Sequence, residues 1–343
     1  MNKIALVIFA LFLALTGECS GQQFGADYAA RVGRADSLFQ AKQYRESGEL
    51  FNRAFAGNGG VGYLHHRYTA VSAWAMVHEA DSAFYHLFRI IERVQYDELD
   101  KVLADSTLHN LRADPRWEKA IGLIKGNKDL KEAKYDRRLI AVLDSVFASD
   151  QKYRLTVYDT INKYGMDSPE VHDINTRIIK ADSINIGIVT NILDTHGWPG
   201  PEVIATHGNT LFLVLQHSDI PTQLKYLPVM RDAVKRGAAQ NSSLALLEDR
   251  VALGQGRCQI YGSQIGLDEK TNRYYVLPVS DPIQVDQRRK EAGLEPLKEY
   301  AAHWKIVWKP ETYRQDLKQL LGEEALEKYD CFQKQNGKKN RLR

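Results

Sequence analysis

Several polar side chains of types used in catalysis and ligand binding lie among apolar residues in the second half of the sequence. Gln216 and His217 directly follow five apolar residues. Further along, Arg250 interrupts a second apolar run, and Gln259 and Tyr261 alternate with less polar neighbours. A buried polar group without a hydrogen-bond partner costs about 1–3 kcal/mol. We therefore expect these side chains to form either a hydrogen-bonded network or a ligand site.

If the group is a site, its residue types indicate a polar or anionic ligand. Arginine presents a planar fork of donors that suits a carboxylate or a phosphate, and glutamine and tyrosine add further donors and acceptors. The alternative is a structural network in which Asp150, Asp249 or Asp286 neutralises the arginines. The candidate ligand-binding residues are Trp198, Gln216, Arg250, Gln259, Tyr261, Gln264 and Arg289.

His217 is the candidate catalytic residue. It lies at the end of an apolar segment, where its surroundings can bring the pKa of the ring close to neutrality, as a general base requires. The alternative is a histidine that is hydrogen-bonded for structural reasons. In the catalytic interpretation, His217 is the general base of a hydrolase and Arg250 binds the anionic part of the substrate.

Other catalytic and cofactor signatures are absent from the sequence. It contains no G-x-S-x-G motif, no P-loop and no dinucleotide-binding fingerprint. His196, His207 and His217 are separated by 11 and 10 residues, and these spacings match no metal-binding motif. We therefore predict no metal ion and no cofactor.

Hydrophobic periodicity predicts the elements that position these residues. Residues 209–217 have no polar face, which favours a short buried helix over the alternative of a strand. Residues 242–254 are predicted to be the next helix, with serine at its start and glycine at its end. From residue 258 the period changes to two, so we predict a β-hairpin within residues 257–279, with Gln259 and Tyr261 on one face of its first strand.

Residues 27–126 are predicted to form antiparallel helical hairpins, of which the first pair covers residues 28–40 and 44–56. Small and large residues recur 36 residues apart at the same helical offsets, as Ser47, Phe51 and Ala54 and then as Ala83, Leu87 and Ile90. This period resembles that of tetratricopeptide repeats, in which each hairpin buries its apolar face by stacking on its neighbours. The alternative is a helical array without repeat ancestry.

A change of composition at residues 126–129 predicts the boundary to a helical domain over residues 130–300. Its first long helices are expected over residues 130–149 and 171–194, with Ile179 and Ile184 on the buried side of the second. Residues 301–343 are expected to be a helical C-terminal extension with a basic tail. The predicted fold class is therefore mainly α: tetratricopeptide-like hairpins followed by a helical domain with one small β-hairpin.

The N-terminus has the pattern of a secretory signal peptide. Lys3 precedes an apolar run of 12 residues, Ile4–Leu15, which is too short to span a bilayer. We predict a signal peptide over residues 1–21, a mature chain without a transmembrane span, and a periplasmic or extracellular location. Lipidation of Cys19 is less favoured because Glu18 precedes it. An uncleaved anchor is the remaining alternative.

Cys258 and Cys331 are the cysteines that follow this segment. An oxidising compartment would allow them to pair, but the sequence does not show whether their backbones lie close enough. The net charge of +3 is too small to indicate nucleic-acid binding. The contents of 44% apolar and 26% charged residues are ordinary for a globular protein.

A set of short motifs occurs in a fixed order between residues 150 and 300. These motifs are Asp150-Gln151 with Arg154, Gly197-Trp198-Pro199, Gln216-His217, Asp249-Arg250, Gln259-x-Tyr261-Gly262-x-Gln264, and Asp286-x-x-Arg289 before Gly293-Leu294. In combination they resemble a widespread bacterial family of domains of unknown function. Ser263 stands where that family usually has threonine, so the hydroxyl is kept. The resemblance implies an exported protein whose domain follows tetratricopeptide-like hairpins, and it implies no reaction.

Two functions agree with these features. The first is an envelope binding or scaffolding protein, with a protein or peptide partner on the hairpin array and a polar network or a pocket for a small polar or anionic ligand in the C-terminal domain. The second is a hydrolase-type enzyme of the envelope that uses His217 and Arg250. Catalysis requires solvent and substrate to reach His217, whereas a binding scaffold allows its ring to be enclosed. We favour the first function.

We predict that the mature protein begins near Gln22 and is recovered outside the cytoplasm, because the apolar run is followed by small residues. Mass spectrometry of the protein from its native host measures this. Retention of Met1 would contradict cleavage, and a lipid on Cys19 would contradict release as a soluble protein.

Overall fold

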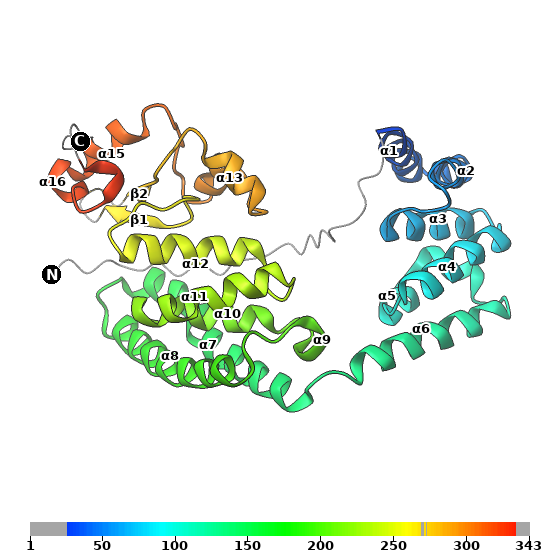
Figure 1. Cartoon of the computed structure of the whole chain (residues 1–343), viewed down its shortest axis with the longest axis horizontal. Helices are drawn as coiled ribbons and strands as arrows, with labels where there is room; N and C mark the ends of the chain where they lie inside the picture. Colours follow the sequence, from blue (N-terminus) through cyan, green and yellow to red (C-terminus); the bar gives the residue numbers. More distant parts are fainter. Residues whose placement is uncertain (1–25, 269–270, 272, 334–343) are drawn as a thin grey trace, which may run out of the picture. The chain divides into compact units, whose positions relative to one another are not determined.

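The structure is a computed structural model that describes residues 26–268, 271 and 273–333 (Figure 1). The predicted signal peptide, Cys19 and the basic tail lie outside these residues. The described chain divides into two compact units, residues 26–134 and 135–333. It is mainly α-helical with one two-stranded sheet, as predicted. None of the described helices is both long and apolar enough to cross a membrane.

The first unit begins with two helical hairpins. Helix α1 (Ala26–Gln40) packs against α2 (Tyr44–Ala56), and α3 (Leu64–Met76) packs against α4 (Ala80–Val94). The residues expected at equivalent buried positions have exposed fractions of 2% or less: Ser47, Phe51, Ala54, Ala83, Leu87 and Ile90. The prediction of stacked helical hairpins is confirmed.

Small residues on α2 allow its neighbours to approach closely. A Cβ atom at Gly48 would lie 2.6 Å from the indole of Trp74 on α3, so only glycine fits here without a shift of the ring. On the adjacent side, the Ser47 hydroxyl donates to the Ala35 carbonyl of α1 at 2.8 Å. Residues 47 and 48 therefore help to set the spacing of three helices.

The remainder of the first unit corrects the predicted domain boundary. Helix α5 (Leu99–Ala104) and the 3₁₀ helix η1 (Ser106–Leu111) precede α6 (Arg116–Glu132), which continues through residues 126–129. Glycine in a helix costs about 1 kcal/mol relative to alanine, but Asn127 anchors this part of α6. Its amide donates to the carbonyls of Ile91 at 3.2 Å and Tyr96 at 3.1 Å.

The second unit is built on a bundle of helices. The long helices α7 (Arg137–Tyr164) and α8 (Pro169–His196) are followed by α9 (Pro201–Ile204), α10 (Gly208–His217), α11 (Ile220–Lys235) and α12 (Asn241–Gly254). The predicted short helix is α10, and its Leu211, Phe212 and Leu215 are at most 2% exposed. These side chains form one core with residues of α7, α8, α11 and α12.

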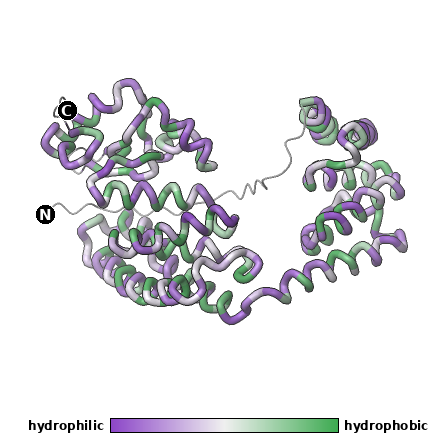
Figure 2. The backbone as a smooth tube through the Cα atoms, in the orientation of Figure 1, coloured by the Kyte–Doolittle hydropathy of each residue, from purple (hydrophilic) through white to green (hydrophobic). Residues whose placement is uncertain are grey.

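The exposure of two isoleucines differs from the prediction. Ile179 is 69% exposed and Ile184 is 56% exposed. Hydrophobic and hydrophilic residues alternate along the long helices (Figure 2), but α8 buries only one stripe, which includes Ile178, Val189 and Ile192. Ile179 and Ile184 lie off that stripe, because a helix that packs on one side can bury only residues three or four apart.

The β-hairpin lies within the predicted range, but its first strand begins later than expected. Strand β1 (Ile265–Asp268) pairs with β2 (Arg273–Val276), and Ile265 lies opposite Val276. Residues 258–263 form no strand, although one isolated bridge joins Gln259 to Val279. Gly262 adopts a φ of +71°, a left-handed conformation that interrupts an extended segment.

The C-terminal helices pack on this hairpin and are not a separate extension. They are α13 (Val285–Glu291), α14 (Leu297–Ala302), α15 (Tyr313–Leu321), α16 (Glu323–Leu326) and the 3₁₀ helix η2 (Asp330–Phe332). Trp308, Tyr313 and Leu317 share one core with Val276 of β2. A disulfide joins Cys258 to Cys331, whose Cα atoms are 6.0 Å apart.

Replacing Leu87 tests the core of the hairpins. Leu87 has an exposed fraction of 0%, so Leu87→Ala should lower the free energy of unfolding of the first unit by about 2–5 kcal/mol. Leu103, which is 45% exposed, provides the control. Leu103→Ala should change the free energy of unfolding by less than about 0.5 kcal/mol. The urea dependence of amide hydrogen exchange in α3 and α4 measures the stability of this unit. Equal effects of both variants would contradict the packing described.

Candidate functional site

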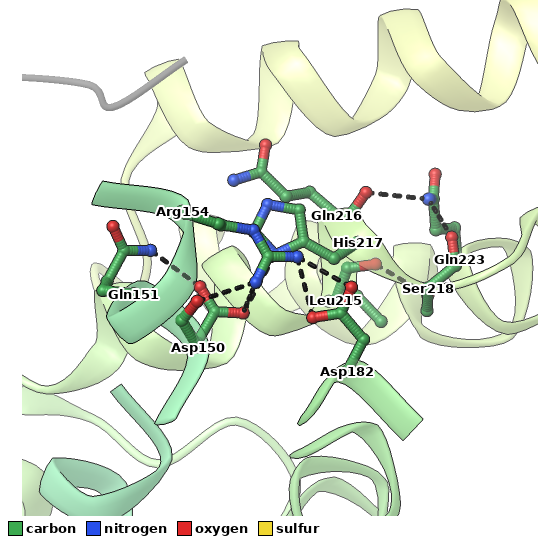
Figure 3. Close-up of polar contacts among 9 residues, drawn as sticks. All are labelled: Asp150, Gln151, Arg154, Asp182, Leu215, Gln216, His217, Ser218 and Gln223. Carbon is green, nitrogen blue, oxygen red and sulfur yellow. Dashed lines mark hydrogen bonds and ion pairs between the residues drawn. The ribbon is translucent and has the colours of Figure 1, made fainter. Parts of the chain in front are cut away.

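A first polar group lies where α7, α8 and α10 meet (Figure 3). Asp150, Gln151 and Arg154 come from α7, Asp182 from α8, and His217 from the last residue of α10. Asp150 and Arg154 are four residues apart, so they share one face of α7. Their side chains are only 1% and 5% exposed. The group therefore places several charges in the interior of the helical bundle.

The charges in this group are paired. The two carboxylate oxygens of Asp182 each accept a hydrogen bond from Nη2 of Arg154 at 2.7 Å. Nη1 of Arg154 donates to Oδ1 of Asp150 at 3.2 Å and to its carbonyl at 2.7 Å. On the other side, Nδ1 of His217 lies 3.0 Å from Oδ1 of Asp150. Gln151 completes the shell of Asp150 by donating to Oδ2 at 2.7 Å.

Burial determines the charge state of His217. It lowers the pKa of the ring from the usual 6.5, although the Asp150 carboxylate opposes this shift. The ring is therefore neutral at neutral pH, with Nδ1 as the donor and Nε2 as an acceptor. Burial alone would raise the pKa of Asp150, but His217 and Arg154 outweigh it, so this pKa falls below its usual value.

This geometry has two chemical interpretations. A carboxylate that orients a histidine through Nδ1 is the arrangement of a general base, and Nε2 of His217 makes no hydrogen bond to the part of the chain that the structure describes. However, the His217 side chain is only 3% exposed. Ligand atoms of Asp150, Asp182 and His217 also lie within 4.8 Å of one another, as a metal site requires, but Arg154 already supplies a positive charge to both carboxylates.

A second polar network is centred on Asp249 of α12. Its carboxylate has an exposed fraction of 0% and accepts three backbone N–H groups, those of Ile260 at 2.6 Å, Tyr261 at 3.0 Å and Ser263 at 2.9 Å. Burial raises the pKa of Asp249, and the three donors oppose this effect. Because residues 260–263 donate to a carboxylate, they have fewer N–H groups for a neighbouring strand. These hydrogen bonds to Asp249 explain why residues 258–263 do not form the predicted strand.

Gln259 and Gln264 close the same loop. The Gln259 amide nitrogen donates to the carbonyls of Gln264 at 3.1 Å and Leu277 at 2.6 Å, and its oxygen accepts the N–H of Gln264 at 2.8 Å. Gln259 is completely buried. Its side chain therefore fixes the loop to the end of the hairpin.

Arg289 and Tyr261 are also tied to the protein itself. Arg289 is 1% exposed and donates to the carbonyls of Glu295 at 2.6 Å and Tyr261 at 2.8 Å. Its guanidinium also lies over the ring of Tyr300, 5.0 Å from the centroid. The Tyr261 hydroxyl donates to Glu248 at 3.3 Å. These contacts indicate a structural role for both side chains.

Arg250 and Gln216 differ from the candidates of the loop network. Within the described ranges, the Arg250 guanidinium makes no hydrogen bond or ion pair, and its Nε is a buried donor without a partner. Burial lowers the pKa of Arg250 to about 10, so the side chain keeps its charge at neutral pH. The Gln216 amide is also without a hydrogen bond to any described residue, although its backbone carbonyl accepts from Gln223 at 3.2 Å.

Trp198 lies elsewhere in the second unit. It is 2% exposed and belongs to the helical core. With Pro199 it lines a surface cavity of about 500 Å³ whose polar lining includes Glu202, Asp232 and Arg236. None of the other predicted ligand residues lines this cavity.

The structure therefore separates the predicted residues into groups. Gln259, Tyr261, Gln264 and Arg289 share the loop network, and His217 belongs to the group around Asp150. The sequence analysis did not identify Asp182. The sequence feature that could have identified Asp182 is its spacing. It follows Ala181 by one residue and Ile178 by four, which places a carboxylate along the buried stripe of α8.

The stability of the second unit should decrease as the pH falls below about 6.5. Because the pKa of His217 is lowered in the folded protein, the unfolded chain binds a proton first, and acid therefore favours unfolding. His217→Asn keeps a donor for Asp150 but does not titrate, so it should remove this part of the decrease. Urea unfolding between about pH 7 and pH 5 measures it. His172, which is exposed, provides the control. The assignment would be contradicted if the pH dependence of the free energy of unfolding were unchanged in His217→Asn but lost in His172→Asn.

Comparison with known proteins identifies a matching family, but it indicates no activity. Residues 140–307 match the family described as "Family of unknown function (DUF6624)". No curated protein and no solved structure matches the chain. The matched range contains both polar networks and the residues Gln216, His217 and Arg250. The C-terminal part of this chain is therefore similar to that family of unknown function.

Proposed function

We propose that the protein is an exported binding or scaffolding protein of the bacterial cell envelope, and that most polar residues of its second unit hold the fold together. The enclosure of His217 carries this proposal: its side chain is 3% exposed, and its Nδ1 is bound to Asp150. A general base must reach the proton that it abstracts. An enclosed ring instead suits a network that joins α7, α8 and α10.

The disulfide supports an exported location. Cys258 and Cys331 are bonded across 73 residues of sequence, and disulfides persist mainly in oxidising compartments such as the periplasm and the extracellular space. The apolar N-terminal run of the sequence points to the same compartments. Together these features favour a periplasmic or extracellular protein.

We assign a protein or peptide partner to the helical hairpins, which we interpret as tetratricopeptide-like. The segment that leads into α3 and the first residue of that helix expose apolar side chains: Val61 is 45% exposed, Tyr63 36% and Leu64 42%. The ring of Tyr63 stacks on that of His65, with centroids 5.6 Å apart. Adjacent exposed apolar and aromatic residues are typical of surfaces that bind other proteins.

A hydrolase of the envelope remains the second candidate. The oriented pair of Asp150 and His217, with Nε2 uncommitted, favours it. In that case His217 acts as the general base and Arg250 binds the anionic part of the substrate. Such an enzyme would have to open the surroundings of His217 before it reacted.

Site-specific cross-linking in the native host tests the proposed function. A photoreactive benzoylphenylalanine in place of Tyr63 should form a defined covalent adduct with an envelope protein, because this side chain lies on the proposed partner surface. The same residue in place of Ile179, which is 69% exposed on the second unit, is the matched control and should form no such adduct. Adducts from both positions, or from neither, would contradict a specific partner on the hairpins.

Hydrolysis assays separate the second candidate from the first. The purified protein should not hydrolyse p-nitrophenyl esters or phosphates above the rate of the His217→Asn variant. A rate that depends on His217 would favour the hydrolase and contradict a purely structural role for the Asp150–His217 pair.

A further inference from the structure

Arg250 is a charged side chain in surroundings that offer it no counter-charge. A buried cation is costly unless it is paired and hydrogen-bonded. The Asp249 carboxylate next to it in sequence is used by three backbone N–H groups. Glu248 pairs with Arg231 at 2.7 Å and accepts from Tyr261. The neighbouring carboxylates are therefore committed to other partners.

A second arginine lies near the same tyrosine as Arg250. Arg289 approaches Tyr300, and the same tyrosine is the residue whose charge most affects the pKa of Arg250. Arg289 donates to two carbonyl oxygens and to no carboxylate. Arg288 likewise donates to the carbonyls of Ile260 at 2.8 Å and Asp281 at 2.6 Å.

Gln216 lies on the element that faces this part of α12. Arg250 and Gly254 are four residues apart and share one face of the helix. A Cβ atom at Gly254 would lie 2.4 Å from Ile220, so this face of α12 meets the junction of α10 and α11. Helix α10 packs against α12, and Figure 3 shows the Gln216 amide without a hydrogen bond to the residues drawn. The two uncommitted side chains thus lie on helices that pack together.

We propose that Arg250 and Gln216 bind the carboxylate or phosphoryl group of a small anionic ligand. The planar guanidinium offers two parallel donors to such a group, and the glutamine amide offers one more. This assignment is independent of the partner proposed for the helical hairpins. It also explains why a cation is kept where the fold itself gives it no partner.

The accessibility of Arg250 fits a bound ligand better than a sealed structural charge. The Nε of Arg250 is a buried donor, and burial lowers the pKa of the side chain to about 10. It nevertheless keeps part of its surface open to solvent, in contrast to Arg289, which is 1% exposed.

Thermal unfolding of the full chain with simple anions tests the site. Inorganic phosphate and acetate are the two probes, and sodium chloride at matched ionic strength is the reference. At least one probe should raise the Tm of the second unit saturably above the reference, because a ligand that binds only the folded state stabilises it. A larger effect of phosphate assigns the site to phosphoryl groups, and a larger effect of acetate assigns it to carboxylates.

Variants make the test specific. Arg250→Gln should abolish the anion-dependent shift, and Arg250→Lys should weaken the apparent affinity about tenfold, since lysine lacks the planar fork. The matched control is Arg177→Gln, because Arg177 is an exposed arginine paired with Asp173 on α8, and it should leave the shift unchanged. Without an anion, Arg250→Gln should unfold at the same temperature as the wild type or higher, because an unpaired buried charge is removed.

Three outcomes would overturn the proposal. The first is the absence of any shift beyond that of sodium chloride in the wild type. The second is an equal shift in the wild type and in Arg250→Gln. The third is a marked loss of stability in anion-free Arg250→Gln, which would show that the arginine is a structural member of the fold. If Arg250→Gln does not fold, Gln216→Ala provides the second variant, and an undiminished shift in it would remove Gln216 from the site.

Discussion

The architecture of the second unit depends on one buried carboxylate. Asp249 accepts three N–H groups from residues 260–263, and these groups would otherwise be left unsatisfied where Gly262 turns the chain. The helix that carries it, α12, packs on the helical core through Leu247 and Val251. The carboxylate therefore joins the helical layer to the hairpin and the C-terminal helices. Removing one partner of such a buried charge costs about 3–5 kcal/mol.

The other buried charges are stabilised in different ways, and the differences indicate their roles. Arg154 is held between Asp150 and Asp182, so its charge is compensated by carboxylates. Arg289 is surrounded by carbonyl oxygens and an aromatic ring. Arg250 has neither arrangement. This difference is the basis of the anion site proposed for Arg250.

The sequence predicted the elements whose signals are local and failed where tertiary contacts decide. The hairpin helices and α10 follow from hydrophobic periodicity, which each segment carries by itself. The boundary at residues 126–129 was placed wrongly because the partners of Asn127 are 31 and 36 residues away. The strand expected at residues 258–263 is replaced by a loop because Asp249 captures its N–H groups. Sequence spacing also gave no indication that Cys258 and Cys331 are bonded.

The candidate site illustrates the same limit at the level of single side chains. Residue types correctly indicated that polar groups gather in this region, but type does not show how much hydrogen-bonding capacity remains. Gln259 uses both its nitrogen and its oxygen on the loop and the hairpin, so it has little left for a ligand. A side chain can bind a ligand only with donors or acceptors that the fold has not used. By that criterion Arg250, Gln216 and Trp198 keep unused donors, the last because its buried indole Nε1 has no partner among the described residues. The uncommitted Nε2 of His217 keeps the enzymatic alternative open to experiment.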